Sequence, residues 1–428
     1  MTSQQSIVGR GDGIGQPWGG RPPHVLIVVE NNSVPYDRRV WMECLALTEV
    51  GMEVDVICPA VDGQPLRERL DGIEVHRFLA PADTGTAAGF VKSYAIGWLR
   101  VARIALRLWW QRPFQVLQAC NPPDTYFALA LLLKPFGVRF LFDQHDLCPE
   151  VYATRFDQTS PAVRGLLRLL ERLTHRVADE VITVNESCRT LLLGRTSTTP
   201  AHLAVVRTGA DLGRLHDVGM QEELRHGSRY LCCYLGVMGP QDGVEMVLHT
   251  AHELVVRRGR TDIGFAILGF GERFDDLRRL ATELGVDDVV TFTGKADDAM
   301  ISAYFSTADV ALQPDLKTEF NDYCSMLKTI EYMAFGLPVV AFDLTETRRS
   351  AGEAGIYVTT ETPVAYADAI AALLGDQETR AAMSRAGRAR SRGELAWDAQ
   401  KKTYVELVRA LCMRAGKRAA LRTGAQNG

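Results

Sequence analysis

Residues 321–343, NDYCSMLKTIEYMAFGLPVVAFD, contain a helix, a stop signal and a buried strand in direct succession. Apolar residues recur at helical spacing in the first half, and Gly336 and Pro338 then predict the end of the helix. The run after Pro338 is continuously apolar, which is typical of a strand that helices cover on both faces. A helix followed at once by such a strand is the repeating unit of a parallel α/β sheet.

The same alternation of short apolar runs and longer helical patterns extends over most of the chain. In the first half, we expect strands at residues 24–30, 53–59, 73–78, 114–119, 138–143, 179–185 and 203–208. In the second half, we expect strands at residues 229–236, 263–269, 289–293, 309–313, 338–343 and 355–358. A polar, charged stretch at residues 209–228 separates the halves. The sequence therefore predicts an α/β protein of two doubly wound, Rossmann-like units in tandem.

These patterns also set the expected boundaries within the chain. The leader at residues 1–22 is rich in glycine, proline, glutamine and serine and lacks the apolar core of a signal peptide, so we expect it to be disordered. The remaining parts are expected to be an N-terminal domain at 23–208, a linker at 209–228, a C-terminal domain at 229–393, a helix at 394–415 that crosses back, and a loose tail at 416–428.

Composition argues against several classes of protein. The 428 residues carry 48 basic and 52 acidic side chains, and the net charge of −4 predicts no general attraction to nucleic acid. No run of about 18 apolar residues is present, so we expect no transmembrane helix. The nine cysteines are scattered without metal-ligand spacing, so we expect reduced, mostly buried thiols in a cytoplasmic protein.

Ligands of open parallel sheets bind beyond the carboxyl ends of the strands. Polar loops follow three strands of the first half, at residues 30–39, 144–146 and 185–187. Glycine-rich loops follow two strands of the second half and include Gly236, Gly269 and Gly271. These glycines do not form a complete dinucleotide fingerprint, and the sequence has no P-loop motif. The loops predict a shared ligand cleft and argue against a nicotinamide dehydrogenase and a P-loop NTPase.

The quoted segment has the features of a phosphate site. Asn321, Asp322 and Ser325 are residue types that cap helices, so we expect the helix to begin near them. Its N-terminus would offer free backbone N–H groups to a diphosphate. Lys328 in the first turn could add a positive charge, and Glu331 on the same face suits the two hydroxyl groups of a ribose. The alternative is an ordinary surface ion pair between Lys328 and Glu331.

Five ordered blocks carry a resemblance to a known family: VENNSVPYDRRVWMECLAL at residues 29–47, NPPD at 121–124, DQHDLCPEVY at 143–152, YLGVMGPQDGVE at 234–245 and KTIEYMAFGLPVVAFD at 328–343. Over residues 25–409, the chain resembles the family 4 glycosyltransferases, in particular the branch of bacterial polysaccharide and cell-surface sugar transferases. The resemblance implies the GT-B fold of two facing Rossmann-like domains. It also implies a nucleotide-sugar donor and retention of configuration at the transferred sugar.

The resemblance places the donor in the C-terminal domain. Glu331 matches the glutamate that holds the nucleotide ribose in the family, whereas the family's other glutamate falls at Tyr323, next to Asp322. We expect the remaining donor contacts from the C-terminal residues already named: Lys328, Ser325, Gly236, Gly269 and Gly271.

The chain departs from the family at the diphosphate. An arginine and a lysine that face the diphosphate in many members are replaced by Val237 and Asp242. Lys328, or the pair Arg38 and Arg39, would then supply the positive charge. Many members also have adjacent glycines near the donor where this chain has residues 37–39.

We expect two catalytic residues in the N-terminal domain, His145 and Arg39. His145 matches the region in which the family places a histidine close to the reacting sugar; the alternative is a structural histidine that bonds loop backbone. The resemblance implies that the departing phosphate helps to deprotonate the acceptor, so stabilisation of the diphosphate is the main requirement. No Asp-x-Asp triplet lies in a suitable loop, so we expect transfer without a metal ion or another cofactor.

The acceptor, a glycan, a lipid-linked sugar or a small molecule, is expected on the N-terminal domain. Residues 90–114 are both basic and aromatic. They predict either an interfacial helix that contacts an anionic membrane or an amphipathic helix packed on the sheet with its arginines outward. The first alternative would place the protein at the inner face of the plasma membrane.

Two other functions remain open from the sequence. One is a nucleotide-sugar 2-epimerase of the same fold, although the block around Glu331 fits a transferase better. The other is a non-catalytic sugar-nucleotide binding protein, which the missing glutamate at Tyr323 and the missing arginine and lysine at Val237 and Asp242 favour. A sugar transferase of bacterial surface polysaccharide or glycoconjugate synthesis is the leading interpretation.

Overall fold

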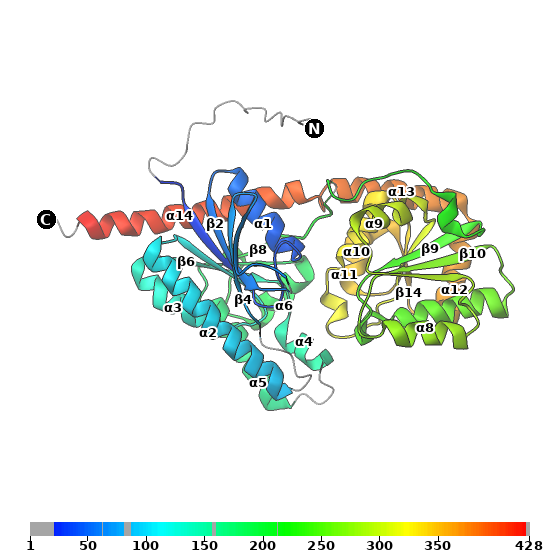
Figure 1. Cartoon of the computed structure of the whole chain (residues 1–428), viewed down its shortest axis with the longest axis horizontal. Coiled ribbons are helices and arrows are strands. Elements are labelled where there is room, and N and C mark those ends of the chain that lie inside the picture. The colour runs from blue at the N-terminus through cyan, green and yellow to red at the C-terminus, as the bar shows by residue number, and fades with distance from the viewer. Residues whose placement is uncertain (1–20, 62, 81–86, 156–159, 212, 425–428) are drawn as a thin grey trace, which may run out of the picture.

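The computed structural model describes residues 21–61, 63–80, 87–155, 160–211 and 213–424. Two α/β domains lie side by side, each with helices on both faces of a sheet, and a long C-terminal helix returns along the N-terminal domain (Figure 1). This arrangement confirms the predicted pair of Rossmann-like domains with a helix crossing back. The predicted leader lies almost entirely outside the described residues.

The N-terminal sheet has eight strands in the order β3-β4-β2-β1-β5-β6-β7-β8. Their bounds are β1 (His24–Val28), β2 (Glu53–Pro59), β3 (Arg67–Leu70), β4 (Ile73–Phe78), β5 (Val116–Cys120), β6 (Arg139–Gln144), β7 (Glu180–Thr183) and β8 (Leu203–Val205). All neighbours pair in parallel except β3, which runs antiparallel to β4. In the middle of the sheet, Leu26 on β1 pairs with Asp55 on β2 and with Leu117 on β5.

Among the described strands of this sheet, β3 is the one that the hydrophobic pattern does not predict. Its sequence is RERL, and its side chains alternate between exposed and half-buried. The strand lies at the edge of the sheet, where charged residues discourage pairing with another chain. An edge strand of this kind carries no apolar run by which it could be recognised.

Helices cover both faces of the N-terminal sheet. Their bounds are α1 (Arg38–Glu49), α2 (Ala87–Gln111), α3 (Phe127–Leu133), η1 (Lys134–Phe136), α4 (Cys148–Arg155), α5 (Pro161–Val177), α6 (Glu186–Arg195) and η2 (Pro200–His202). Alternate residues of β1 point to opposite faces. Leu26 packs in one core with α2 and α3, and Ile27 packs in another with α1 and the C-terminal helix.

The C-terminal sheet has six parallel strands in the order β11-β10-β9-β12-β13-β14. Their bounds are β9 (Tyr230–Leu235), β10 (Ile263–Leu268), β11 (Val290–Gly294), β12 (Val310–Gln313), β13 (Val339–Phe342) and β14 (Gly355–Val358). The helical elements are η3 (Glu222–Arg225), η4 (Pro240–Asp242), α7 (Val244–Ala251), η5 (His252–Arg257), α8 (Phe274–Glu283), α9 (Asp298–Thr307), η6 (Asn321–Tyr323), α10 (Leu327–Phe335), α11 (Thr345–Ala351), η7 (Gly352–Ala354), α12 (Pro363–Gly375) and α13 (Gln377–Arg392).

The last helix, α14 (Trp397–Gly424), joins the two domains. It packs against α1, β5 and β6 of the N-terminal domain and extends beyond the predicted end at residue 415. Its Tyr404 is fully buried and donates a hydrogen bond of 2.6 Å from Oη to Oε1 of Gln118 on β5. The C-terminal end of the chain thus completes the core of the N-terminal domain.

Helix α10 begins later than the sequence predicts. Its N-cap is Met326, without a side-chain hydrogen bond, while Asn321 and Asp322 lie in the separate short helix η6. Asp322 instead accepts hydrogen bonds from the backbone N and Oγ1 of Thr345, at 2.8 and 2.9 Å. The predicted stop is confirmed, because Gly336 ends the helix with a φ of 76°.

Candidate functional site

A cavity of about 130 Å³ lies between the two domains. The N-terminal domain contributes the loop that follows β6, with His145 and Asp146, and the end of the last strand region at Thr208. The C-terminal domain contributes the segment that leads into α10, including Tyr323 and Ser325. The structure therefore brings His145, Tyr323 and Ser325, which the sequence predicts as site residues, to the wall of one cavity.

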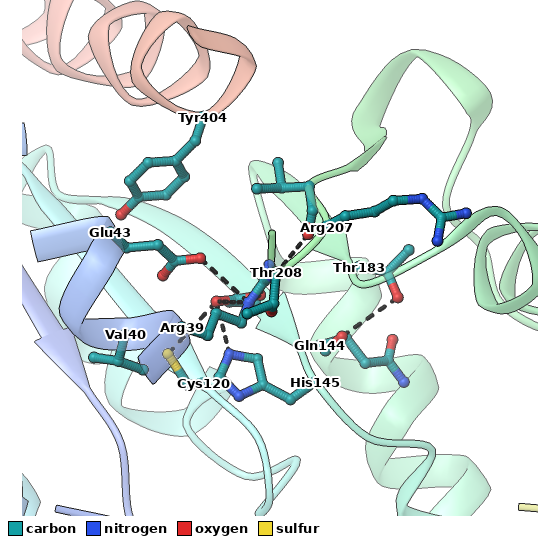
Figure 2. Close-up of polar contacts among 12 residues, drawn as sticks. Arg39, Val40, Glu43, Cys120, Gln144, His145, Thr183, Arg207, Thr208 and Tyr404 are labelled. Atoms are coloured by element: carbon teal, nitrogen blue, oxygen red, sulfur yellow. Dashed lines mark hydrogen bonds and ion pairs between the residues drawn. The ribbon is translucent and has the colours of Figure 1, made fainter. Parts of the chain in front are cut away.

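The imidazole ring of His145 is bonded to a buried carboxylate. Its Nε2 lies 2.8 Å from Oδ2 of Asp143, which is the last residue but one of β6. Arg39 at the start of α1 donates to Oδ1 of the same carboxylate from Nη2, at 2.7 Å, and from Nε, at 3.2 Å. Figure 2 shows His145 and Arg39 converging on this position from different elements. Asp143 lies within the DQHDLCPEVY block, but only the tertiary structure shows that its carboxylate binds both Arg39 and His145.

The charges in this network perturb one another. Burial alone would lower the pKa of His145, but the adjacent Asp143 carboxylate outweighs it and raises the pKa to about 9. Burial alone would raise the pKa of Asp143, but Arg39 and His145 hold it well below its usual range. His145 is therefore an imidazolium at neutral pH. Its Nδ1 makes no hydrogen bond within the described part of the chain, so this nitrogen is available to a ligand.

Arg39 uses each of its guanidinium nitrogens inside the protein. Besides its bonds to Asp143, Nη1 donates to the backbone oxygen of Val206 at 2.5 Å, and Nε lies 3.2 Å from Oε1 of Glu43. Only 5% of Arg39 is exposed. The predicted catalytic contact of Arg39 stays a prediction, and the geometry gives this residue the position of a support for Asp143 and His145.

A second layer anchors the network to the C-terminal helix. Gln118 on β5 donates from Nε2 to Oε2 of Glu43 at 2.7 Å and accepts from Tyr404 of α14. Burial, together with the nearby charge of Asp143, raises the pKa of Glu43 to about 8. The chain Tyr404–Gln118–Glu43–Arg39 thus connects the returning helix to the site.

Asn121 fixes the backbone of the loop that carries His145. Its Oδ1 accepts from the backbone N–H groups of His145, at 2.6 Å, and Asp146, at 3.1 Å. Its Nδ2 donates to the backbone oxygen of Asp146 at 2.7 Å. Asn121 begins the NPPD block, and its fully buried amide links that block to the loop that carries His145.

Glu331 lies on α10 and is engaged by the linker between the domains. Arg214 donates from Nη2 to Oε1 of Glu331 at 2.6 Å and from Nη1 to Oδ1 of Asp298 at 2.5 Å. Arg38 of the N-terminal domain lies 3.7 Å from the same Asp298 oxygen. Burial raises the pKa of Glu331 to about 7, against the attraction of Arg214 and Arg38. This ionic chain spans both domains, and no sequence motif indicates Arg214 or Asp298.

Lys328 lies on the same helix but has a different partner. Its Nζ is 3.0 Å from Oδ2 of Asp315 and lies over the ring of Tyr234, 4.7 Å from the centroid. The alternative of an ion pair between Lys328 and Glu331 is therefore not what the structure contains. Burial would lower the pKa of Lys328, but Asp315 outweighs it and raises the value, so the ammonium group is charged.

The other predicted donor residues surround this helix start. Asn185 of the N-terminal domain donates from Nδ2 to the backbone oxygen of Tyr323, at 2.8 Å, and to Oγ of Ser325, at 2.9 Å. The glycine loops pack on each other, since a Cβ at Gly269 would lie 1.9 Å from the backbone oxygen of Gly236. A Cβ at Gly271 would lie 2.6 Å from the backbone of Met238. These glycines are required by the close approach of two backbones.

One group of potential metal ligands occurs among the described residues, formed by Cys120, Asp143 and His145. Arg39 already pairs with Asp143, and a guanidinium at 2.7 Å opposes a cation at the same carboxylate. Burial raises the pKa of the Cys120 thiol well above its usual value, which disfavours the thiolate that binds metals. The cluster is better suited to holding a charged imidazole than a metal ion.

Family models match both domains. Residues 36–209 match a glycosyl transferase 4-like domain, and residues 229–376 match the glycosyl transferases group 1. Solved structures of the same fold include sucrose-phosphate synthase from Thermosynechococcus elongatus, with a TM-score of 0.69 and 20% identity over 91% of this chain and 99% of that one. Anabaena Alr3699/HepE in complex with UDP has a TM-score of 0.68 and 14% identity over 91% of this chain and 100% of that one.

Curated relatives are similar at modest identity. A D-inositol 3-phosphate glycosyltransferase of Thermomonospora curvata is 25% identical over 83% of this chain and 86% of its own length. A second enzyme of that name, from Corynebacterium efficiens, is 28% identical, but the match covers 43% of this chain and about half (45%) of the relative. Alpha-D-kanosaminyltransferase of Streptomyces kanamyceticus is 30% identical over 39% of this chain and 42% of its own length. With both domains matched by family models, the chain belongs to the family 4, or group 1, glycosyltransferases, and its two domains form the GT-B fold.

Proposed function

We propose that this protein transfers a sugar from a nucleotide-sugar donor, bound between its two domains, to an acceptor on the N-terminal domain. The observation that carries the proposal is the interdomain cavity, in which His145 faces the segment leading into α10. Helix α10 then supplies Lys328 and Glu331. The proposal is supported by the relatives, which are named as glycosyltransferases, and by solved structures of similar fold that hold UDP and UDP-glucose.

The donor groups match the chemistry of the residues. Glu331 would accept hydrogen bonds from the ribose hydroxyls. These bonds would either replace its bond to Arg214 or form in addition to it. Lys328 is a buried ammonium group, and Arg38 is a half-exposed guanidinium at the edge of the N-terminal domain, so both can balance a diphosphate. These two cations would replace those that the family has at Val237 and Asp242.

The reaction breaks the bond between the anomeric carbon and the β-phosphate oxygen and forms a bond to the acceptor oxygen. In the proposed retaining mechanism, the departing phosphate takes the proton of the acceptor hydroxyl on the same face of the sugar. The imidazolium of His145 would stabilise charge near the leaving group through Nδ1. We propose that neither a metal ion nor another cofactor takes part, which a full rate in the presence of a chelator would support.

A second cavity of about 260 Å³ meets the first at Tyr323 and suits the acceptor. It is lined by Arg168, Arg172 and Arg195, together with three glutamates. Arg195 is neutralised by Glu150 and Glu171, at 2.7 and 2.6 Å, whereas Arg168 has no ion-pair partner in the described part of the chain. We propose an acceptor with an anionic group, in line with the phosphorylated acceptor in the name of the inositol relatives.

The proposed cellular setting is the reducing cytoplasm, in the synthesis of a bacterial surface polysaccharide or glycoconjugate. All nine cysteines are free thiols, and eight of them are buried. No helix in the described ranges is long and apolar enough to cross a membrane. A lipid-linked acceptor would require contact with a membrane surface.

A donor panel tests the proposal directly. UDP-, GDP-, dTDP- and ADP-sugars are offered with and without phosphorylated polyol acceptors, and nucleotide release is measured for the wild type, Glu331→Gln and the control Glu283→Gln. Glu283 is an exposed carboxylate on α8, so its loss is expected to change nothing. The proposal is supported if the wild type and Glu283→Gln release the nucleotide from one donor and Glu331→Gln does not.

Two other outcomes would replace the proposal. Conversion of the donor sugar to its 2-epimer, with the nucleotide still attached, would indicate an epimerase. Tight binding of a nucleotide, without turnover of the donor in the presence of any acceptor, would indicate a binding protein.

A further inference from the structure

Four neighbouring helical elements form one layer on the N-terminal sheet. The inner side of α2 packs on the sheet through residues such as Val101 and Ala105, and α3 continues the same core. Trp109 of α2 contacts Phe136 of η1, with ring centroids 4.8 Å apart, and α3 packs against α5. Figure 1 shows α2, α3 and α5 on the same side of this domain, away from the C-terminal helix. We call the outward side of α2, α3, η1 and α5 the basic face.

The basic face has an unusual distribution of charge. Helices α2 and α5 carry four arginines or lysines each, and η1 adds Lys134. The sequences of α2, α3 and α5 contain a single acidic residue, Glu171, which is fully buried and paired with Arg195. The whole chain has more acidic than basic residues, so this positive surface is a local concentration rather than a reflection of composition.

The same face exposes large apolar side chains. On α2, Trp110 is 79% exposed and Leu99 is 64% exposed, next to the exposed Arg103 and Arg107. Neither arginine forms an ion pair within the described ranges, and the two lie between Leu99 and Trp110 at helical spacing. Exposed apolar residues continue across the neighbouring elements: Leu131, Leu132, Phe136, Leu166 and Leu169.

We infer that the basic face docks on the surface of a bilayer that contains anionic lipids. Tryptophan, phenylalanine and leucine side chains enter the boundary between headgroups and acyl chains, while the arginines bind lipid phosphates. An acidic soluble protein would also match the positive charge of this face. However, the seven exposed apolar side chains are spread over several helices, and such a partner would have to supply a separate pocket for each of them. The contact is peripheral, because no helix in the described ranges can span a membrane.

This inference goes beyond the transfer reaction and does not depend on the identity of the donor. The second cavity opens beside α5, so a bilayer at the basic face would lie next to the proposed acceptor site. The three arginines that line this cavity, Arg168, Arg172 and Arg195, are therefore left unchanged in the test below.

Vesicle flotation of the full chain tests the inference. Vesicles of phosphatidylcholine alone are compared with vesicles that contain phosphatidylglycerol, at low and high salt. We expect the wild type to float only with the anionic vesicles and to be released by salt. Each lost arginine should lower binding about fivefold, so Arg103→Glu with Arg107→Glu should abolish flotation.

Two further variants separate the face from general effects of charge and polarity. Trp110→Ser with Leu132→Ser should also reduce flotation, since it removes apolar burial without changing the charge. Arg278→Glu with Val364→Ser, at exposed positions of the C-terminal domain, is the matched control and should float like the wild type. Circular dichroism and thermal unfolding verify that each variant is folded.

Several results would overturn the inference. Wild-type protein that stays at the bottom of the gradient with anionic vesicles at low salt excludes membrane docking. Flotation that is unchanged in both basic-face variants, or reduced equally in the control, excludes this face. A concentration-dependent dimer that the basic-face variants abolish, without flotation, would assign the surface to a second copy of the chain.

Discussion

Nη2 of Arg214 lies 2.6 Å from Oε1 of Glu331, so a residue of the interdomain linker holds the carboxylate predicted to bind the ribose. Arg214 also reaches Asp298, and Arg38 of the N-terminal domain lies within 3.7 Å of that aspartate. The proposed donor site is thereby connected to both domains and to the linker between them. Closure of the domains on a donor would rearrange this ionic chain.

Loss of Arg214 should move the pH dependence of donor binding to higher pH. The pKa of Glu331 is raised to about 7 even with Arg214 present, and the ribose needs the ionised form. Binding should therefore weaken as pH falls through about 7, and Arg214→Gln should move this midpoint upward. Isothermal titration of the nucleotide between pH 6 and 9 measures the shift. Arg260→Gln, which removes a surface pair with Asp262, is the control, and an unchanged midpoint in Arg214→Gln would refute the coupling.

Activity should fall as pH rises through about 9, because His145 then loses its proton. The raised pKa also means that the charged imidazole stabilises the fold below the unfolded pKa of about 6.5, and that this contribution is lost through about pH 9. Asp143→Asn removes the carboxylate that raises the pKa, so the alkaline limb of kcat/KM should move toward neutral pH. A variant with an unmoved alkaline limb would show that another group titrates there.

Replacement of Gly269 by alanine should damage the C-terminal domain. The residue has a φ of 132°, and an added Cβ would lie 1.9 Å from the backbone oxygen of Gly236, which cannot move without its strand. We expect a loss of more than about 2 kcal/mol in unfolding free energy, together with weaker nucleotide binding. Gly285→Ala is the matched control, since it has a positive φ but no atom within 4 Å. For Gly285→Ala, urea unfolding should show a loss of about 1 kcal/mol in unfolding free energy.

Removal of one hydroxyl from the C-terminal helix should weaken the N-terminal domain. Tyr404 donates from its buried Oη to Gln118, so Tyr404→Phe leaves a buried amide oxygen without this partner. We expect a cost of about 1–2 kcal/mol in urea unfolding. Tyr36→Phe, at a residue that is 57% exposed, should cost nothing measurable. Equal stability of the two variants would show that α14 is not anchored through this bond.

The local order of elements was readable from the sequence. Buried parallel strands require continuous apolar runs, so the central strands and the helix–strand unit ending at Val339–Phe342 were predictable within one or two residues. The edge strand Arg67–Leu70 escaped detection because one exposed side allows it to be charged. The start of α10 also differed, since Asp322 bonds Thr345 and cannot cap a helix that begins after Met326.

By itself, the sequence determined the two α/β domains, the loops at the strand ends and the positions of His145 and Glu331 on those loops and helices, because apolar periodicity and chain punctuation are local properties. Only the tertiary structure decided the partners. It paired Lys328 with Asp315, Glu331 with Arg214 and Arg39 with Asp143. Helical spacing shows which side chains share a face, but the stability of a buried charge depends on whichever opposite charge the fold brings beside it, and that charge can come from any distance along the chain.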